Sequence, residues 1–542
     1  MEEIKETLLY SITGSHWKKI GIFPHHGINL PLSALHSENS CGIGEFFDLL
    51  PMIDWASRMK LDVIQLLPLN NSETDPSPYN AVSSCALNLV YLSLYALPHI
   101  EELPDLQKKL KDLHKLNDLK RIAYTEVLTH KLNWLQAYFA EVKDKIVSSK
   151  EFKDFVDDNP WVEAFALFKT LRERLGNTSW DNWPEELRTY PPVEFDALIK
   201  QHWEDVSFYI ATQFLCYGQL KEVKAYANQK KIFLMGDIPI FVSMQSVDVW
   251  EFPEYFNTNL SAGAPPDFYA KDGQNWGLPL YQWDALRKDH YKWWKQRLRY
   301  AENFYDLFRI DHVLGFFRVW AIPPHLKGID GDFVPEDQTK WELQGRELLS
   351  MICSSTTMLP IAEDLGVVPK MVRATIKEFG ICGTKVIRWE RKWDEDKRYI
   401  PIQYYPPISL TSVSTHDSET LTLWWKNFSD DTKEFAAFKH WTYTPDLSEK
   451  QREEILWDSH HTSSLFHVNL LQEYFAFYPE LSWPNPEDER INIPGTNFAS
   501  NWTYRFRPTV EEITSHQGLF SRMENIIFSP SPPATLHNNN GK

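Results

Sequence analysis

The sequence predicts an α/β protein built on a (β/α)8 TIM barrel, and two observations support this prediction. From residue 231 onward, short apolar runs alternate with stretches of helical periodicity, which is typical of a parallel sheet covered by helices. Four of the apolar runs also end in a carboxylate, and functional groups in such barrels lie at the C-terminal ends of the strands. A length of 542 residues suits this fold, because α/β barrels run long as single domains.

The first 230 residues are expected to supply two strands and a large insertion. We interpret residues 1–20 as a short N-terminal extension, which precedes a first strand within 27–35 and a second strand within 61–69. Leucines then recur at helical spacing among charged residues, which indicates an inserted, largely helical subdomain over 101–200. A long helix over 202–228 is expected to return the chain to the barrel.

The rest of the chain carries the other predicted strands, which cover residues 232–236, 304–310, 358–362, 384–388 and 410–415. Between two of them lies the Pro/Gly-rich segment 263–281, which has no periodicity. Long loops of this kind inside compact domains are usually functional or disordered, and its aromatic and amide side chains favour an ordered loop that covers the substrate. Residues 424–471 are predicted to be helical. We expect a single catalytic domain over 21–528 and a disordered tail over 529–542.

The composition argues against several classes of protein. The net charge of −18, from 74 acidic and 56 basic residues, disfavours a nucleic-acid partner, which would need a basic surface. The five cysteines form no CxxC pair and no cluster with histidines at zinc spacing, so we expect a reducing compartment and no metal. The start of the chain lacks a signal-peptide pattern, and the charge-free stretch 76–100 holds asparagines, serines and prolines. We therefore expect a cytoplasmic protein without a membrane partner, and no glycine loop indicates a cofactor.

Four acidic residues follow predicted strands, namely Asp237, Asp311, Glu363 and Asp417. Asp237, Asp311 and Asp417 could each alone be a strand-end cap or part of an ion pair. If Asp311, Glu363 and Asp417 meet at one rim, they suit the cleavage of a glycosidic bond, which requires a proton donor for the leaving oxygen and an anion for the oxocarbenium-like carbon. A separation of ~5–5.5 Å between two carboxylates lets one act as a nucleophile and gives retention of configuration.

Two neighbouring side chains fit this chemistry. Arg309 lies two residues before Asp311, so both belong to one face of a strand, and a nearby cation would hold Asp311 ionised by lowering its pKa. Glu363 would be the acid/base and would need a raised pKa in a closed site. His416 and Asp417 could grip sugar hydroxyls while the ring distorts, although His416 could equally be a packed histidine.

Several longer motifs make the chain resemble the 4-α-glucanotransferases of glycoside hydrolase family 77, the amylomaltases or disproportionating enzymes. The matching stretches occur in family order over nearly the whole chain: SPYNAVSSCALNLVYLSL from Ser77, GDIPIFV from Gly236, GAPPDFYAKDGQNWGLPLYQWDAL from Gly263, FRIDHVLGFFRVW from Phe308, AEDLGVVP from Ala362, THD from Thr415 and INIPGT from Ile491. The resemblance implies a barrel of the α-amylase type with inserted subdomains around its rim.

The resemblance also implies a role for each catalytic residue. It makes Asp311 the nucleophile, Glu363 the acid/base and Asp417 the third carboxylate, which stabilises the transition state. Arg309 and His416 match the companions of these three carboxylates and are expected to bind substrate.

Five further positions are implied to bind the glucan. Asp237 and Tyr79 match substrate contacts around the cleaved bond, whereas Asp267, Gln274 and Trp276 match a loop that covers the acceptor side. From the residues alone, Tyr79 and Trp276 would more readily be interpreted as core aromatics.

The function predicted on these grounds is a retaining transfer of an α-1,4-glucan segment. The donor would be a malto-oligosaccharide or glycogen-type glucan, and the acceptor would be the 4-hydroxyl of glucose or of a malto-oligosaccharide. A retaining α-glucan hydrolase remains open, because both enzymes share the first half-reaction. A non-catalytic glucan-binding protein on the same barrel is a further alternative, and the intact catalytic carboxylates disfavour it. No pattern in the sequence predicts the oligomeric state.

Overall fold

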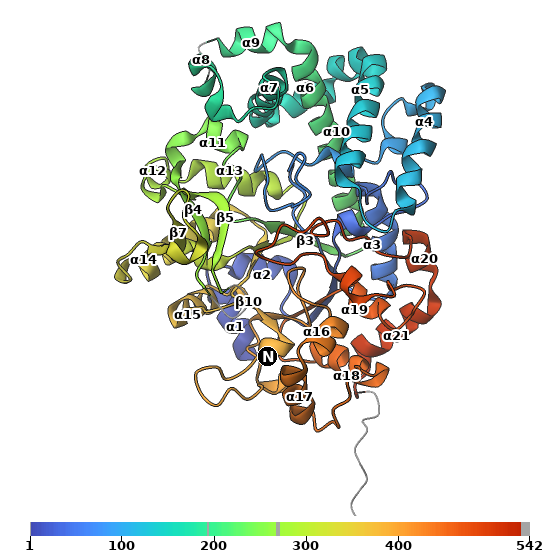
Figure 1. Cartoon of the computed structure of the whole chain (residues 1–542), viewed down its shortest axis with the longest axis vertical. Helices are drawn as coiled ribbons and strands as arrows, with labels where there is room; N and C mark the ends of the chain where they lie inside the picture. The colour runs from blue at the N-terminus through green and yellow to red at the C-terminus, as the bar shows by residue number, and fades with distance from the viewer. Residues whose placement is uncertain (1, 192–193, 267–270, 533–542) are drawn as a thin grey trace, which may run out of the picture.

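The computed structural model describes residues 2–191, 194–266 and 271–532, and a closed barrel of eight parallel strands forms its centre (Figure 1). Around the barrel the strands follow the order β1-β12-β11-β10-β9-β6-β3-β2, so barrel strands that follow one another along the chain are neighbours in the barrel. They are β1 (His25–Asn29), β2 (Val63–Gln65), β3 (Phe233–Ile238), β6 (Leu307–Ile310), β9 (Leu359–Ala362), β10 (Cys382–Val386), β11 (Ser409–Ser412) and β12 (Phe466–Leu470). The predicted (β/α)8 barrel is confirmed.

The strand period of two explains why charged side chains gather at one end of the barrel. The register aligns Met235 with Leu307 and, two residues later, Asp237 with Arg309. Met235 and Leu307 belong to an apolar cluster drawn from most of the strands, which only the barrel interior can bring together. Asp237 and Arg309 share their strand faces and therefore lie one layer higher, at the C-terminal rim.

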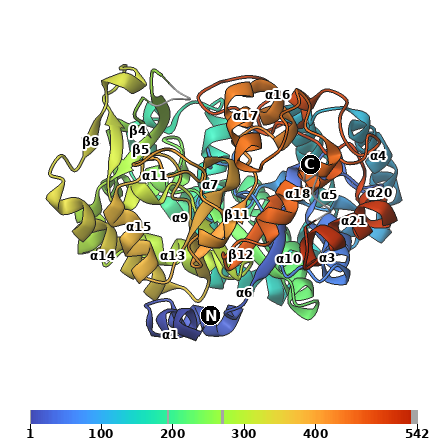
Figure 2. The ribbon, with the colours of Figure 1, turned by 90° about the horizontal axis from the view of Figure 1, so that it is seen from below.

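The N-terminal residues close the other end of the barrel. Helices α1 (Glu2–Tyr10) and α2 (Gly14–Ile20) lie at the bottom of Figure 2, opposite α16 (Leu421–Asn427) and α17 (Ser429–Phe438). Trp17 is fully buried, its ring lies 5.9 Å from that of Phe466, and its indole N–H donates to the carbonyl of Gly380 over 2.8 Å. The stretch expected to be an extension thus packs into the barrel core.

A group of helices lies on one side of the barrel, at the top of Figure 1. They are α4 (Pro104–His114), α5 (Tyr124–Ser148), α6 (Lys150–Asp158), α7 (Trp161–Arg174), α8 (Glu185–Arg188) and α9 (Phe195–Gln201), and α10 (Trp203–Gln229) leads back to β3. A buried ion pair fastens this group to the barrel domain: Lys131 of α5 bonds Glu45 and the carbonyls of Val90 and Leu92.

A second, antiparallel sheet stands beside the rim, in the order β5-β4-β7-β8. Its strands are β4 (Phe256–Ala264), β5 (Gln274–Tyr281), β7 (Val319–Ile322) and β8 (Asp332–Val334). The ordered loop expected over 263–281 is a strand at both of its ends, because residues 263–264 belong to β4 and residues 274–281 form β5, which pairs with β4. Residues 267–270 of this segment lie outside the described part of the chain. The pairing shifts register twice, and the polar and glycine-rich composition hides the alternation that strands usually show.

The helical prediction for residues 424–471 is wrong at its end, because Phe466–Leu470 is the last barrel strand. All five residues of β12 are buried, including His467 and Asn469, so the strand shows neither an apolar run nor a polar face.

The other helices are α3 (Leu49–Arg58), α11 (Val247–Glu251), α12 (Trp283–Lys288), α13 (Lys292–Ala301), α14 (Thr339–Ser355), α15 (Lys370–Glu378), α18 (Glu449–His460), α19 (Gln472–Phe475), α20 (Val510–Ser515) and α21 (Gln517–Phe528).

Candidate active site

Three carboxylates surround the guanidinium of Arg309 at the C-terminal rim. Its Nη1 lies 2.7 Å from Asp237 Oδ2 and 3.0 Å from Asp311 Oδ1, and its Nη2 lies 3.8 Å from Glu363 Oε2. The residues come from the ends of three adjacent strands, β3, β6 and β9. The expected pairing of Arg309 with Asp311 is present, and the same cation also binds the neighbouring strands together.

Glu363 is held by backbone donors and enclosed by protein. The N–H of His312 donates to Glu363 Oε2 over 2.7 Å, and the N–H of Leu365 donates to Oε1 over 3.1 Å. His312 has a φ of 46°, a left-handed conformation that lets the turn after Asp311 aim its amide at this carboxylate. Burial raises the pKa of Glu363 to about 7, against the opposing influence of Arg309, which is the state expected for a general acid.

Asp417 and His416 stand at the end of β11 and meet residues from other strands. His416 Nε2 lies 3.2 Å from Asp417 Oδ2 and 3.0 Å from the hydroxyl of Tyr79, which donates to Asp237 Oδ2 over 2.7 Å. Burial would raise the pKa of Asp417, but His416 and the amide of Asn492 outweigh it and lower this pKa to about 2. The predicted residues Tyr79, Asp237, His416 and Asp417 thus form one connected group.

A C-terminal segment completes the site with residues that were not singled out from the sequence. Asn492 Nδ2 donates to Asp417 Oδ1 over 2.7 Å, and the ring of Trp502 lies 5.4 Å from that of Tyr79 and 5.9 Å from that of His416. The motif INIPGT, which begins at Ile491, is among the matching stretches of the sequence. That motif locates the segment, but it does not identify the contact with Asp417.

Strand β5 brings the predicted acceptor residues to the edge of this group. The indole N–H of Trp276 donates to Gln274 Oε1 over 3.2 Å, and its ring stands edge-on to His312 at 5.1 Å. Trp276 is therefore next to the turn that carries Asp311 and orients Glu363. Asp267, also predicted to contact the acceptor, lies outside the described residues.

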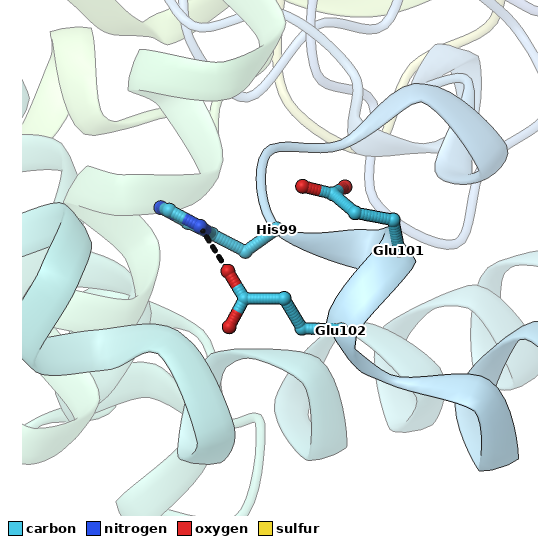
Figure 3. A group of neighbouring side chains, drawn as sticks. All are labelled: His99, Glu101 and Glu102. Carbon is cyan, nitrogen blue, oxygen red and sulfur yellow. Dashed lines mark hydrogen bonds and ion pairs between the residues drawn. The ribbon is translucent and has the colours of Figure 1, made fainter.

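A different group of possible ligands, His99, Glu101 and Glu102, lies at the start of the helical insertion (Figure 3). His99 Nδ1 is 2.8 Å from Glu102 Oε1, and Lys145 Nζ is 2.5 Å from Glu102 Oε2. Lys145 already binds the carboxylate of Glu102 and would compete with a metal ion for it. These side chains therefore form a group of ion pairs at the surface.

Within the described part of the chain, no helix is both long and apolar enough to cross a bilayer. The cytoplasmic location expected from the sequence remains a prediction.

A closed parallel barrel with an acidic site on its C-terminal rim defines the class of (β/α)8-barrel enzymes. Within that class, a family model described as 4-alpha-glucanotransferase matches residues 30–511. The chain belongs to the 4-alpha-glucanotransferase family and is an enzyme of this type.

Relatives from two species support this assignment over almost the full length. The chain is 43% identical over 520 residues to a 4-alpha-glucanotransferase of Chlamydia pneumoniae, with 96% of this chain and 98% of the relative covered. It is 42% identical over 517 residues to the 4-alpha-glucanotransferase of Chlamydia trachomatis serovar D, with 94% and 96% covered.

Among solved structures, the fold resembles that of an amylomaltase from Streptococcus agalactiae in complex with acarbose. The TM-score is 0.79 at 24% sequence identity, and the match covers 93% of this chain and 98% of that chain. An amylomaltase from Corynebacterium glutamicum gives a TM-score of 0.75 at 20% identity, covering 95% and 76%.

Proposed function

We propose that the rim carries out a two-step transfer of an α-1,4-glucan segment, with Asp311 as the nucleophile. In the first step Asp311 forms a bond to the anomeric carbon, the glycosidic C–O bond breaks, and Glu363 gives its proton to the leaving 4-oxygen. In the second step Glu363 takes the proton of an acceptor 4-hydroxyl, and that oxygen replaces Asp311 on the anomeric carbon. Two inversions give net retention.

The observation that carries this proposal is the difference between the surroundings of Glu363 and Asp311. Burial raises the pKa of Glu363 to about 7, so it can hold a proton near neutrality and later accept one. The side chain of Asp311 is 22% exposed, and its Oδ1 lies 3.0 Å from Nη1 of Arg309, so it reaches the open side of the rim beside a cation. Pairs of carboxyl groups in contrasting environments are the usual basis of acid and nucleophile roles.

The other predicted residues would bind the sugar whose bond is cleaved. Asp417 stays anionic and faces the rim, so it can accept hydrogen bonds from sugar hydroxyls as positive charge develops on the ring. Tyr79, His416 and Asp237 form the hydrogen-bonded wall beside it.

We further propose malto-oligosaccharides or a glycogen-type glucan as donors, and glucose or malto-oligosaccharides as acceptors. The complex of the Streptococcus agalactiae amylomaltase with acarbose supports oligosaccharide binding in this fold. Trp276 and Gln274 would contact the acceptor, because Trp276 packs against the turn that carries Asp311 and orients Glu363, and Gln274 is hydrogen-bonded to Trp276.

The test is incubation of the purified enzyme with maltotriose, with products separated by chain length and free glucose measured. A ladder of longer oligomers together with glucose is expected for transfer. Maltose and glucose alone, with rising reducing ends, would instead indicate hydrolysis. Asp311→Asn is expected to lower turnover by at least 10³-fold at an unchanged unfolding temperature, because the covalent intermediate cannot form. Substantial activity in this variant would remove Asp311 as the nucleophile.

A further inference from the structure

The segment from Arg490 to Trp502 holds the third carboxylate at two points. Asn492 is 8% exposed, and its Nδ2 donates to Asp417 Oδ1 over 2.7 Å. Arg490 Nη2 donates to the main-chain carbonyl of Asp417 over 3.3 Å, and its Nη1 donates to Glu419 Oε1 over 2.6 Å. The carboxylate and the backbone that carries it are therefore fixed by the same neighbouring segment.

Internal bonds make this segment rigid. The side chain of Asn501 accepts from the N–H of Ile493 over 3.3 Å and donates to the carbonyl of Thr496 over 3.0 Å. The N–H of Trp502 donates to the carbonyl of Ile491 over 2.8 Å, and Trp502 adopts a φ of 61°, which is uncommon for a bulky residue. A side chain that supports a catalytic group acts best when its own position is locked in this way.

The two oxygens of Asp417 have different partners. Oδ1 accepts from Asn492, and Oδ2 lies 3.2 Å from His416 Nε2. An amide donates a hydrogen bond but cannot take up a proton from the carboxyl group or lose one at any working pH. Asn492 therefore fixes the rotation of the carboxylate without neutralising the charge that the reaction uses.

We propose that Asn492 is a positioning residue for glucan transfer, which holds the Asp417 carboxylate in the orientation that stabilises the transition state. This inference rests on the proposed function of Asp417. A bond made to the anionic form also favours that form, and Asn492 is among the groups that outweigh burial and lower the pKa of Asp417.

The experiment compares two variants of Asn492 with controls, using maltotriose disproportionation. Asn492→Asp preserves the shape but replaces the donor by a second carboxyl group, and Asn492→Ala removes the contact. Asn497→Ala is the matched control, because Asn497 is an exposed residue of the same segment. For each protein we would measure kcat and KM from pH 4 to pH 9, together with the unfolding temperature.

We expect kcat to fall about 10- to 100-fold in both Asn492 variants while KM changes less than about threefold, because a misplaced group loses transition-state stabilisation. In Asn492→Asp, kcat should also fall at the acid end of this pH range, since two adjacent carboxyls share a proton and the second of them ionises at a higher pH than Asp417 alone. Asn497→Ala should match the parent enzyme.

Two outcomes would overturn the proposal: a kcat within twofold of the parent in both variants, or variants that fail to fold, which would make the role structural. Asp417→Asn separates this failure from failure of the proposed function. An active Asp417→Asn enzyme would refute the role of Asp417 itself. An inactive Asp417→Asn enzyme, together with Asn492 variants that keep the kcat of the parent, would refute only the role of Asn492.

Discussion

At the scale of single residues, burial and one shared cation act in opposite directions on the protonation of three carboxylates. Arg309 lies within 4 Å of Asp237, Asp311 and Glu363. Closely placed like charges disfavour simultaneous ionisation, and burial adds to the cost. Burial raises the pKa of Glu363, the farthest of the three from the guanidinium, to about 7, and it also raises the pKa of Asp237. Glu363 can therefore hold a proton near neutrality, as the acid role that we propose for it requires.

The first residue-scale prediction concerns Glu363→Gln. This change removes the proton donor but preserves the shape of the side chain, so turnover of maltotriose should fall about 10²- to 10⁴-fold. A maltosyl donor with a nitrophenolate leaving group needs no protonation, so its first half-reaction should remain fast. Rapid-mixing measurement of nitrophenolate release should show a burst followed by slow turnover. Equal loss with both donors would contradict the acid role, and Asp311→Asn, which should give no burst, is the control.

At the scale of elements, the sequence predicts features that depend on neighbours along the chain better than those that depend on packing. Carboxylates at the ends of β3, β6, β9 and β11 are visible as apolar runs that end in an acid. Strand β12 is not visible, because buried His467 and Asn469 interrupt its apolar pattern and find partners only in the folded barrel. The bond from Asn492 to Asp417 joins positions 75 residues apart, and no local pattern encodes it.

The β4–β5 hairpin leads to a prediction about water. Trp276 stands edge-on to His312 and bonds Gln274, so it lies beside the turn that carries Asp311, on the side where we propose that the acceptor binds. In Trp276→Ala, water should reach the intermediate more easily, and the hydrolysed fraction of turnovers should rise several-fold or the acceptor KM should increase. The ratio of free reducing ends to transfer products measures this. Trp393→Ala is the control, since Trp393 is a 59% exposed tryptophan in the β10–β11 connection. If both variants behave like the parent, Trp276 has no role in excluding water.

The attachment of the helical insertion gives a stability prediction. Lys131 and Glu45 are both fully buried, and burial raises the pKa of Glu45 to about 7 even beside this lysine. Lys131→Met should lower the free energy of unfolding by about 3–5 kcal/mol, because it leaves an unpaired buried carboxyl group. The carboxyl group of Glu45 can take up a proton and so become neutral, and the loss of unfolding free energy should therefore be smaller at pH 6 than at pH 8. Urea unfolding at both pH values tests this, and equal losses would contradict it.

At the scale of the whole molecule, the barrel closes where β1 meets β12, and neutral histidines pack along that junction. His26 Nδ1 lies 3.1 Å from His460 Nδ1, and its ring stacks on that of His467 at 4.9 Å. Two ring nitrogens at this distance need one donor and one acceptor, so both rings cannot be charged. Burial lowers the pKa of His26 to about 4, and it lowers those of His460 and His467 well below the usual 6.5.

The sign of the resulting pH dependence follows from the lowered pKa of His26. The imidazole of His26 takes up a proton below about pH 6.5 in the unfolded chain but only near pH 4 in the folded protein. The contribution of neutral His26 to the free energy of unfolding is therefore complete above pH 6.5 and is lost as the pH falls towards 4. Relative to His26→Asn, the parent should lose about 1.4 kcal/mol per pH unit in that window. Denaturant unfolding of both proteins at pH 7, 6 and 5 measures the difference. A constant difference would show that His26 is not held neutral.

The packing of the first helices against the last strand has a consequence during synthesis. Trp17 emerges from the ribosome well before its partners Gly380, which follows 363 residues later, and Phe466. The same holds for β1, because β12, one of its two neighbours in the barrel, begins at residue 466. Contacts so distant in sequence form late, and an unpaired strand edge meanwhile invites association with other chains. The nascent enzyme must therefore keep Trp17 and β1 from aggregating until β12 has been translated.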